Sequence, residues 1–557
     1  MPNTKTLLDH VYEHARQHPD RIYLSQPTGN GQVVDITWAQ AVDQASRMAA
    51  HLKSRGLEPG ARVAMLSKNC AHFVIAELAI WMAGCTTVAI FPTETATTVR
   101  YVLEHSGSSL LLVGKLDTWP AQKSGVPDGL PCIAMPLAPQ TNFDTWDSVV
   151  SRTKPLPKPT QRRAADLAMI MYTSGSTGTP KGVMSSFAAI TAAGAGAAAH
   201  VHKYAGTDNR ALSYLPLAHS FERTWIEAAS LVAGDTRLYF AETLETFLQD
   251  LQRARPTLFI SVPRLWLKFQ QGVFAKMPPA KLDRLLKLPI IGKIVGKKIR
   301  TGLGLDQVKL AGSGSAPIPA DLIDWYRRIG LPLYEGYGMT EDNSYSHNSI
   351  PGLAEAGCVG VAMPDVQVKI SDTGEILIKS PGAMSGYYKQ PELDAECFTP
   401  DGFFRTGDLG ELKPNGLLKI TGRAKEIFKT AKGKYIAPAP IENLINAHPM
   451  IELSMVSGVG QPSAYAIVVL SETLRPRLGD ADVRKQVQGE LEKLLKQVND
   501  SVADYAQLRM LVVAQEPWSI ENGCLTPTMK IKRMRIESAV EPAVEQWYTG
   551  TARVVWA

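Results

Sequence analysis

The chain has 557 residues, of which 45% are hydrophobic and 20% are charged, and its 59 Lys and Arg against 53 Asp and Glu give a formal charge of +6. This composition excludes a disordered or fibrous protein, and the length suggests about two to four domains. The excess of positive charge is too diffuse to predict nucleic-acid binding. Six scattered cysteines with no Cys-x-x-Cys pair favour free thiols in a reducing, cytoplasmic compartment over disulfides or structural zinc.

The first 115 residues alternate helical and strand-like patterns. The expected elements are a helix over 38–55 closed by Gly56, a strand over 62–66, a helix near 97–105 and a strand over 109–113. Strands that alternate with helices predict parallel βαβ units in a layered α/β domain.

The longest apolar run, residues 73–91, approaches the ~20 residues that cross a bilayer. Gly84 divides it into an alanine-rich part and a β-branched part, so we expect a buried helix followed by a buried strand. A single membrane span is the weaker alternative. The N-terminal residues lack the apolar core and small-residue cleavage site of a secretory signal, which favours a soluble protein.

The rest of the chain divides into a linker, a hairpin and a smaller segment. Residues 152–163 carry three prolines and five cations and predict an exposed linker. Residues 403–412 and 417–423 flank an Asn-Gly pair and predict a β-hairpin. Beyond it we expect an α+β segment with helices over 440–447 and 482–498 and strands within 452–470. The expected domains are 1–422 and 423–557.

The most distinctive motif is YTSGSTGTPKGVM, residues 172–184, which follows a short apolar strand. Its glycines allow backbone N–H groups to approach phosphate oxygens, its hydroxyls add donors, and Lys181 adds charge. It departs from a Walker A loop because Pro180 precedes the lysine and Gly182 follows it. A flexible surface turn is the alternative, which a run this rich in Ser, Thr and Gly makes less favoured.

This motif resembles the phosphate loop of the adenylate-forming enzymes, which include acyl-CoA synthetases. Four further motifs resemble that family in the same order: YEGYGMTE at 334–341, TGD at 406–408, GRAKEIFK at 422–429 and LTPTMKIKR at 525–533. The resemblance covers about residues 10–540. It implies an α/β fold with a large N-terminal domain of layered α/β subdomains and a hairpin-rich subdomain, followed by a small mobile α+β domain.

The resemblance also implies a reaction in two steps. A carboxylate attacks the α-phosphate of ATP and releases pyrophosphate, and the acyl group then passes to a thiol. Glu341 with Thr173 would bind Mg²⁺, Lys181 would contact phosphate, and Lys530 would reach the α-phosphate and the attacking carboxylate. The implied ATP and AMP contacts are Thr173, Ser174, Gly175, Ser176, Thr177, Gly178, Ser315, Ala316, Tyr337, Gly338, Thr340, Asp408 and Arg423. Among them, Tyr337 would stack on adenine and Asp408 would accept the ribose hydroxyls.

The catalytic lysine has one alternative. Many members of the family have Gly before this lysine, whereas this chain has Met529. Lys530 is our choice and Lys532 the second candidate. The resemblance further implies that Lys425 is the hinge about which the small domain rotates, and that Gly433 borders the channel for CoA.

Three segments point to one branch of the family. LPLAHSFER at 215–223, SVPRLW at 261–266 and residues 428–438 resemble long-chain acyl-CoA synthetases. They imply a medium- to long-chain fatty acid and CoA as substrates, His219 near the substrate carboxylate, and Trp225 beside an acyl tunnel. The simpler interpretation of His219 is a hydrogen-bonded core histidine, and that of Trp225 is an ordinary part of the apolar core.

Two other functions stay open. The enzyme could load the phosphopantetheine of a carrier protein instead of CoA, since the first half-reaction uses the same motifs. A non-catalytic lipid-surface protein with the same fold is the alternative of another class, and the intact charged motif positions disfavour it.

The charge is not evenly distributed. Residues 276–300 contain eight cations and one anion, a net charge of +7 that leaves −1 for the rest of the chain. Cations interleaved with aliphatic residues predict peripheral association with an anionic membrane, at the inner face of the cell membrane. A solvated helical hairpin is the equally weighted alternative.

Overall fold

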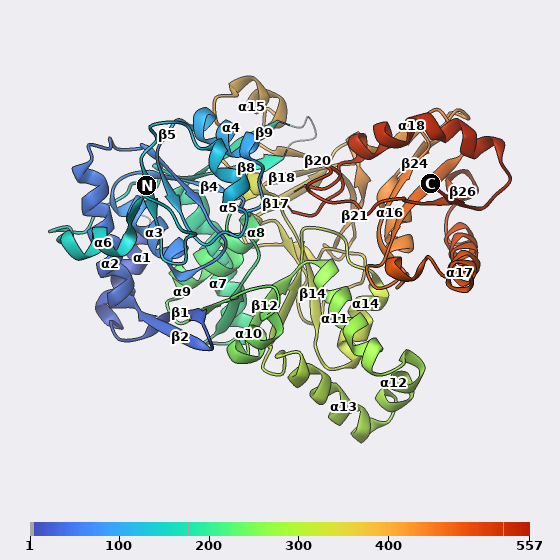
Figure 1. The fold of residues 1–557 in the computed structure, drawn as a ribbon, viewed down its shortest axis with the longest axis horizontal. Coiled ribbons are helices and arrows are strands. Elements are labelled where there is room, and N and C mark those ends of the chain that lie inside the picture. The colour runs from blue at the N-terminus through green and yellow to red at the C-terminus, as the bar shows by residue number, and fades with distance from the viewer. Residues whose placement is uncertain (1–4, 175–178, 527) are drawn as a thin grey trace.

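The computed structural model describes residues 5–174, 179–526 and 528–557. Its largest sheet has eight strands in the order β19-β9-β8-β4-β3-β5-β6-β7. The last six strands of this order, from β8 through β4, β3, β5 and β6 to β7, run parallel to one another. These strands are β3 Arg62–Leu66, β4 Thr86–Ile90, β5 Ser108–Val113, β6 Cys132–Ala134, β7 Asp144–Thr145, β8 Leu167–Ser174, β9 Pro180–Ser186 and β19 Gly386–Tyr387. The expected parallel βαβ arrangement is therefore confirmed, and Figure 1 shows helices packed against this sheet.

The helices of this region follow the sequence pattern closely. They are α1 Leu7–Gln17, α2 Trp38–Ser54, α3 Ala71–Met82, α4 Ala96–Ser106, α5 Trp119–Gln122 and α6 Trp146–Arg152. Helix α2 begins after Thr37, whose hydroxyl accepts the N–H of Gln40 while the Gln40 side chain accepts the N–H of Thr37. This reciprocal cap satisfies donors that a helix start leaves free, and Gly56 follows the helix at φ 76°.

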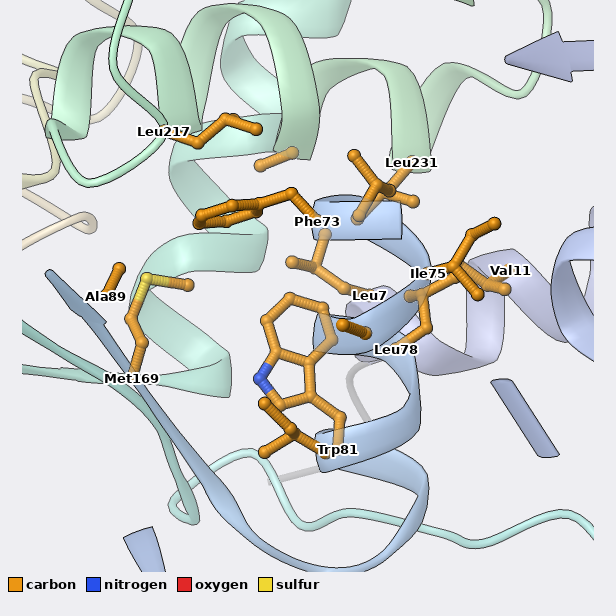
Figure 2. Packing of buried hydrophobic residues seen from close by; sticks show 14 of the residues in the cluster. Leu7, Val11, Phe73, Ile75, Leu78, Trp81, Ala89, Met169, Leu217 and Leu231 are labelled. Atoms are coloured by element: carbon orange, nitrogen blue, oxygen red, sulfur yellow. The ribbon is translucent and has the colours of Figure 1, made fainter. Parts of the chain in front are cut away.

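The apolar run 73–91 forms the buried helix and buried strand that the sequence predicts. Helix α3 is buried along almost its whole length and is followed by β4. In Figure 2, Phe73, Leu78 and Trp81 of α3 lie among side chains of other elements, with Leu7 on one side and Met169 on another. Among the helices that the structure describes, none has the length and apolarity needed to cross a membrane.

Residues 152–163 are only partly the exposed linker that the sequence predicts. Most of the segment is exposed, but the Arg162 side chain is 5% exposed. Its guanidinium donates to the carbonyl oxygens of Trp81, Cys85 and Leu167. The segment is therefore held against the end of α3 and the start of β8, because a buried cation needs such partners.

Two further sheets complete the layered part of the large domain. One has the order β10-β11-β1-β2, and the other has the order β12-β13-β14-β15-β16 with β12 to β14 parallel. Their strands are β1 Ile22–Gly29, β2 Gln32–Thr37, β10 Arg210–Ser213, β11 Arg237–Phe240, β12 Leu258–Ser261, β13 Leu310–Ser313, β14 Leu333–Tyr337, β15 His347–Asn348 and β16 Val361–Ala362. The helices are α7 Phe187–Ala205, α8 Ser220–Glu222, α9 Ala229–Ala233, α10 Phe247–Ala254, α11 Pro263–Lys276, α12 Pro279–Leu286, α13 Pro289–Gly302 and α14 Ala320–Arg328.

A hairpin-rich sheet connects the large domain to the small one. It consists of β17 Gln367–Ile370, β18 Glu375–Lys379, β20 Phe404–Leu412 and β21 Leu418–Arg423, and α15 Pro391–Cys397 precedes β20. The predicted hairpin is β20–β21, and in its turn Gly416 adopts φ 82°. This turn favours a glycine because residues with a side chain rarely adopt such a φ.

The C-terminal segment folds as the small α+β unit that the sequence predicts. Strands β24 Ile451–Ser457, β25 Ala464–Leu470, β26 Leu508–Val513 and β27 Val554–Trp556 form one sheet with helices α16 Pro438–Asn446, α17 Ala481–Asp500 and α18 Arg533–Thr549. The short hairpin of β22 Phe428–Lys429 and β23 Tyr435–Ile436 joins this unit to β21. Figure 1 shows the small domain at one end of the molecule, beside β20 and β21.

Candidate active site

A cleft lies along the parallel strands β12, β13 and β14. It holds about 550 Å³ of empty space, part of it open to solvent. Its lining includes Ser315, Tyr337 and Gly338, whereas Ala316 is exposed and lies outside the lining. Ser315 adopts φ 67°, which turns the chain sharply after β13. Ser315, Tyr337 and Gly338 lie at the carboxyl ends of the parallel strands β13 and β14, the usual position of a ligand site in α/β sheets.

Asp408 is held at the edge of this cleft by two donors. The Tyr337 hydroxyl donates to its Oδ2 at 2.7 Å, and the Arg423 Nε donates to its Oδ1 at 2.8 Å. The negative charge of Asp408 raises the pKa of Arg423, and burial together with that charge raises the pKa of Tyr337. Each carboxylate oxygen has a second lone-pair site, so Asp408 can still accept two hydroxyls of a ligand.

Glu341 and Lys181 meet around a tyrosine that sequence reasoning missed. Tyr387 donates its hydroxyl to Glu341 Oε1 at 2.8 Å, and the Lys181 Nζ lies 5.5 Å from the centre of the Tyr387 ring. Burial and the neighbouring Glu341 charge raise the pKa of Tyr387. Tyr387 lies on the two-residue strand β19, beside β9, and its Gly-Tyr-Tyr surroundings carry no motif that could have identified it.

The predicted phosphate loop connects β8 and β9. Thr173 pairs with Lys181 across this hairpin, so both candidates lie at the base of the loop. Gly175, Ser176, Thr177 and Gly178 lie outside the described residues, as does the side chain of Ser174. Strand β8, which precedes these residues, is the short apolar strand that the sequence predicts there.

Lys530 reaches this group of charges from the small domain. Its side chain remains accessible to water, but crowding by the surrounding protein and the positive charge of Arg423 lower its pKa, whereas Asp408, Glu341 and Glu426 act in the opposite direction. Its charge also acts on His219. Lys532, the second candidate, instead lies near Glu94. The geometry therefore favours Lys530 over Lys532 as the lysine that serves the cleft.

A tight turn presents Lys530. The N–H of Thr526 donates to the carbonyl oxygen of Lys530 at 2.8 Å, and the N–H of Lys530 donates to the Thr526 hydroxyl at 3.1 Å. Met529 adopts φ 62° within this turn. A glycine at this position carries no such conformational cost, which gives a physical reason for the glycine that many family members have before their lysine.

We expect Met529→Val to lower the rate of acyl-adenylate formation and Met529→Gly to preserve it. A β-branched residue is a strong outlier at positive φ, and it would disfavour the turn by about 1–2 kcal/mol. The rate is measured as pyrophosphate release that depends on the acid substrate. Met534→Val, at an exposed position in α18, is the matched control. Equal rates in Met529→Val and the wild type would contradict this role of the turn.

His219 lies at the start of α8. Its Nδ1 accepts the N–H of Phe221 at 3.1 Å, so the ring caps this short helix. Burial, with a smaller contribution from the charge of Lys530, lowers the pKa of His219 to about 3. The imidazole is therefore neutral near pH 7, and its Nε2–H is the donor that remains.

Trp225 separates the cleft from a second cavity. The second cavity holds about 250 Å³ of empty space, part of it open to solvent, and Trp225 and Leu258 line both cavities. Its other lining residues are mostly small or aliphatic: Ala198, Val201, His202, Ala211, Ile226, Ala229, Ser230, Ala233 and Thr236. The Trp225 Nε1 donates to the carbonyl oxygen of Ser344 at 3.0 Å, three residues after Glu341. The indole is thus fixed to the segment that follows a predicted catalytic residue.

Trp225 belongs to a π-helix, Arg223–Ala228, that a buried charge cluster anchors. Arg223 forms ion pairs with Glu77 of α3 and, at 2.9 Å, with Glu227. All three side chains are at most 2% exposed. Glu77 is the single charge in the apolar run 73–91, and its partner in the LPLAHSFER motif explains how that run accommodates it.

The predicted hinge and CoA-channel residues lie in the connection between the domains. Lys425 lies in the 3-10 turn Ala424–Glu426, directly after β21. Gly433 adopts φ 78° in the turn between β22 and β23, and its N–H donates to the carbonyl oxygen of Thr430. Arg533, which sequence reasoning did not single out, pairs with Glu442 at 2.7 Å and with Glu426 at 3.5 Å. Arg533 therefore links the turn that contains Lys425 to helix α16 of the small domain.

The candidate metal ligands have the donor chemistry that magnesium prefers when it is bound together with phosphate. Glu341 and Thr173 supply a carboxylate and a hydroxyl oxygen, the ligand type that Mg²⁺ prefers. Within residues 5–174, 179–526 and 528–557 there is no group of three or more His, Cys, Asp or Glu side chains arranged around one point. Magnesium usually keeps several waters and takes one or two carboxylates plus substrate phosphates, so this sparse set is sufficient.

Comparison with known proteins identifies the family of this chain. Residues 11–388 match the AMP-binding enzyme family, and residues 425–552 match the AMP-binding enzyme C-terminal domain. A long-chain-fatty-acid–CoA ligase from Mycobacterium bovis is 30% identical over 97% of this chain and 96% of that protein, and human long-chain-fatty-acid–CoA ligase 1 is 28% identical over 92% and 82%. The adenylation domain of a carboxylic acid reductase from Segniliparus rugosus, solved with AMP, superposes with a TM-score of 0.80 at 21% identity over 98% of this chain and 95% of that one.

Proposed function

The chain belongs to the AMP-binding enzyme family, and on this basis we propose that it is an ATP-dependent ligase that joins a medium- to long-chain fatty acid to CoA. The observation that carries the proposal is the apolar second cavity behind Trp225, directly beside a cleft that Tyr337 lines. Asp408 accepts a hydrogen bond from Tyr337, and the charge of Lys530 acts on Asp408. A carboxyl group can lie among the charges while its hydrocarbon chain extends into the apolar space. The relatives named as long-chain-fatty-acid–CoA ligases support this substrate class.

The first step brings a carboxylate to the α-phosphate of ATP. Both reactants are anions, so the protein must neutralise charge that accumulates between them. Lys530 would contact the attacking oxygen and the α-phosphate from the small domain, and Lys181 would contact the departing pyrophosphate. His219, neutral and with Nε2–H free, would donate to the fatty-acid carboxylate and orient it.

The metal would be held by Glu341 and Thr173. When bound, magnesium supplies positive charge at the phosphate oxygens and fixes their orientation. Tyr387 would keep Glu341 in position through its 2.8 Å hydrogen bond. The nucleoside would lie along β14, with its ribose hydroxyls on Asp408 and its adenine against Tyr337, between Ser315 and Gly338. Arg423 would support the ribose and phosphate region.

The second step requires a different position of the small domain. The charge of Lys530 acts on Asp408, Glu341 and His219 in this structure, so the lysine would withdraw before a thiol approaches the acyl-adenylate. Rotation about Lys425, in the turn that follows β21, would remove Lys530 and bring the Gly433 turn to the cleft. With no side chain at Gly433, the thin pantetheine arm of CoA can pass close to the backbone.

The proposal predicts that narrowing the second cavity shortens the accepted chain. Ala198→Leu adds carbon atoms to the cavity wall, so we expect kcat/KM to fall by about 10-fold or more for the longest accepted acids and to change little for shorter ones. Acyl-CoA formation is measured with ATP, Mg²⁺ and CoA over fatty acids of increasing length. Ala188→Leu is the matched control, because Ala188 is exposed on the same helix α7.

Two results would overturn the proposal. One is that no fatty acid of any length yields acyl-CoA. The other is that a holo carrier protein outcompetes CoA for the acyl-adenylate, which would assign the enzyme to carrier loading. A uniform loss of activity over all chain lengths in Ala198→Leu would contradict the position of the tunnel, and a melting curve distinguishes this result from unfolding.

A further inference from the structure

The helix pair α12–α13 exposes apolar side chains that a soluble surface normally avoids. Leu288, Ile290, Ile291 and Ile294 are 45%, 75%, 45% and 62% exposed, and they fall within seven consecutive residues. We call this group the apolar tip. Figure 1 shows α12 and α13 projecting from the large domain, with α13 at its outer end. Clustered exposed aliphatic residues mark an interaction surface more often than isolated ones do.

Close packing against neighbouring elements fixes the orientation of α13. The exposure of the apolar tip therefore does not result from a loosely attached helix. A Cβ atom at Gly292 would lie 2.6 Å from the carbonyl oxygen of Leu286, and one at Gly296 would lie 2.7 Å from the carbonyl oxygen of Ile329. Both glycines are buried. The helix therefore presses its smallest residues against α12 and the end of α14, and the same geometry turns Ile290 and Ile294 outward.

Cations surround the apolar tip. Lys287 is exposed in the turn between α12 and α13, and Lys293, Lys297 and Lys298 are exposed on α13. The one acidic residue of 276–300, Asp283, already pairs with Arg328 at 2.7 Å. Two copies of this surface would repel each other, and four aliphatic side chains fall well short of the ~800 Å² per partner of a standard protein interface. The charge pattern instead complements an anionic surface.

We propose that α12–α13 docks the enzyme on an anionic lipid membrane, with the apolar tip in the headgroup region and the lysines at the lipid phosphates. Aliphatic side chains gain free energy on leaving water, and cations near an anionic leaflet add attraction that salt screens. The proposal does not depend on which acid the enzyme activates, because membrane binding is measured without substrate. It assigns a surface to the basic segment that the sequence singled out.

The test is co-sedimentation of the full-length protein with vesicles of phosphatidylcholine alone or mixed with phosphatidylglycerol. We expect binding to the anionic vesicles only, and weaker binding as salt increases. Lys293→Glu/Lys297→Glu/Lys298→Glu should reduce the partition coefficient by at least about 100-fold. Ile290→Asn/Ile294→Asn should reduce it by about 10-fold or more at every salt concentration, because this change removes insertion rather than attraction.

Matched controls separate the surface from general effects. Lys123→Glu/Lys485→Glu/Lys496→Glu changes the net charge equally at exposed positions on other elements, and Leu244→Asn/Val459→Asn replaces equally exposed aliphatic residues. All variants should keep the wild-type melting temperature and acyl-adenylate formation with a water-soluble acid. The proposal would be overturned if the wild-type protein does not bind anionic vesicles, or if the variants of α13 bind as well as the wild type does. It would also be overturned if the control variants lose binding to the same extent as the variants of α13. Binding to an acidic protein but not to lipid would also overturn it.

Discussion

Replacing Lys530 by alanine is expected to lower the rate of acyl-adenylate formation by about 100- to 1000-fold, the usual cost of removing one group that stabilises developing negative charge. The ammonium group lies where Glu341 and Asp408 act on its charge and where it acts on His219. Removing it leaves two anionic reactants with less compensation as they approach. The measurement is pyrophosphate release in single turnovers, with the melting temperature as the check on folding.

Lys532→Ala is the matched control, since it removes the same charge two residues away on a side chain that lies near Glu94. We expect it to change the rate by less than about 10-fold. The opposite ranking of the two variants would assign the chemistry to Lys532. The pH profile gives a second check: crowding and Arg423 lower the pKa of Lys530, so the ammonium loses its proton at lower pH than an ordinary lysine. The adenylation rate should therefore decline on the alkaline side before an ordinary lysine would titrate.

Local patterns predicted most of the fold because they act over short stretches of chain. Strand β3 occupies the predicted residues 62–66, and the run 73–91 divides where Gly84, at φ 87°, interrupts it. The caps, glycines and periodicities that define such elements lie within a few residues of one another. Arg162 is the exception, because its burial depends on carbonyl groups of α3 and β8 that lie far from it in the sequence.

The site was predictable to the extent that its residues lie in motifs. Asp408, Tyr337 and Arg423 come from three motifs and meet within hydrogen-bonding distance. Tyr387 has no motif of its own, and only the pairing of β19 with β9 brings it to Glu341. The bond from Trp225 to Ser344 was equally invisible, because it joins a π-helix to a segment in which Asn343 and Ser344 both adopt φ 53°. Long-range contacts of this kind need the folded chain.

The buried cluster around Arg223 is expected to have the largest effect on stability. Arg223→Ala would leave Glu77 and Glu227 in the core without their cation, and losing one partner of a buried ion pair costs about 3–5 kcal/mol. Burial already raises the pKa of Glu227 well above its usual value, so one of the two carboxyl groups can take up a proton and limit the loss. Urea denaturation measures the free energy of unfolding. Arg328→Ala, which breaks an exposed pair with Asp283, should cost less than about 1 kcal/mol.

The reciprocal experiment separates the role of charge from the role of packing. Arg223→Met/Glu77→Met/Glu227→Leu removes all three charges together, and a buried ion cluster replaced by apolar residues of similar volume is often as stable as the original. We expect the triple variant to recover most of the stability that Arg223→Ala loses. If both variants are equally unstable, packing rather than unpaired charge governs the site. If the triple variant is stable but shows altered chain-length preference, the cluster serves chiefly to hold the π-helix, and with it Trp225, at the wall between the two cavities.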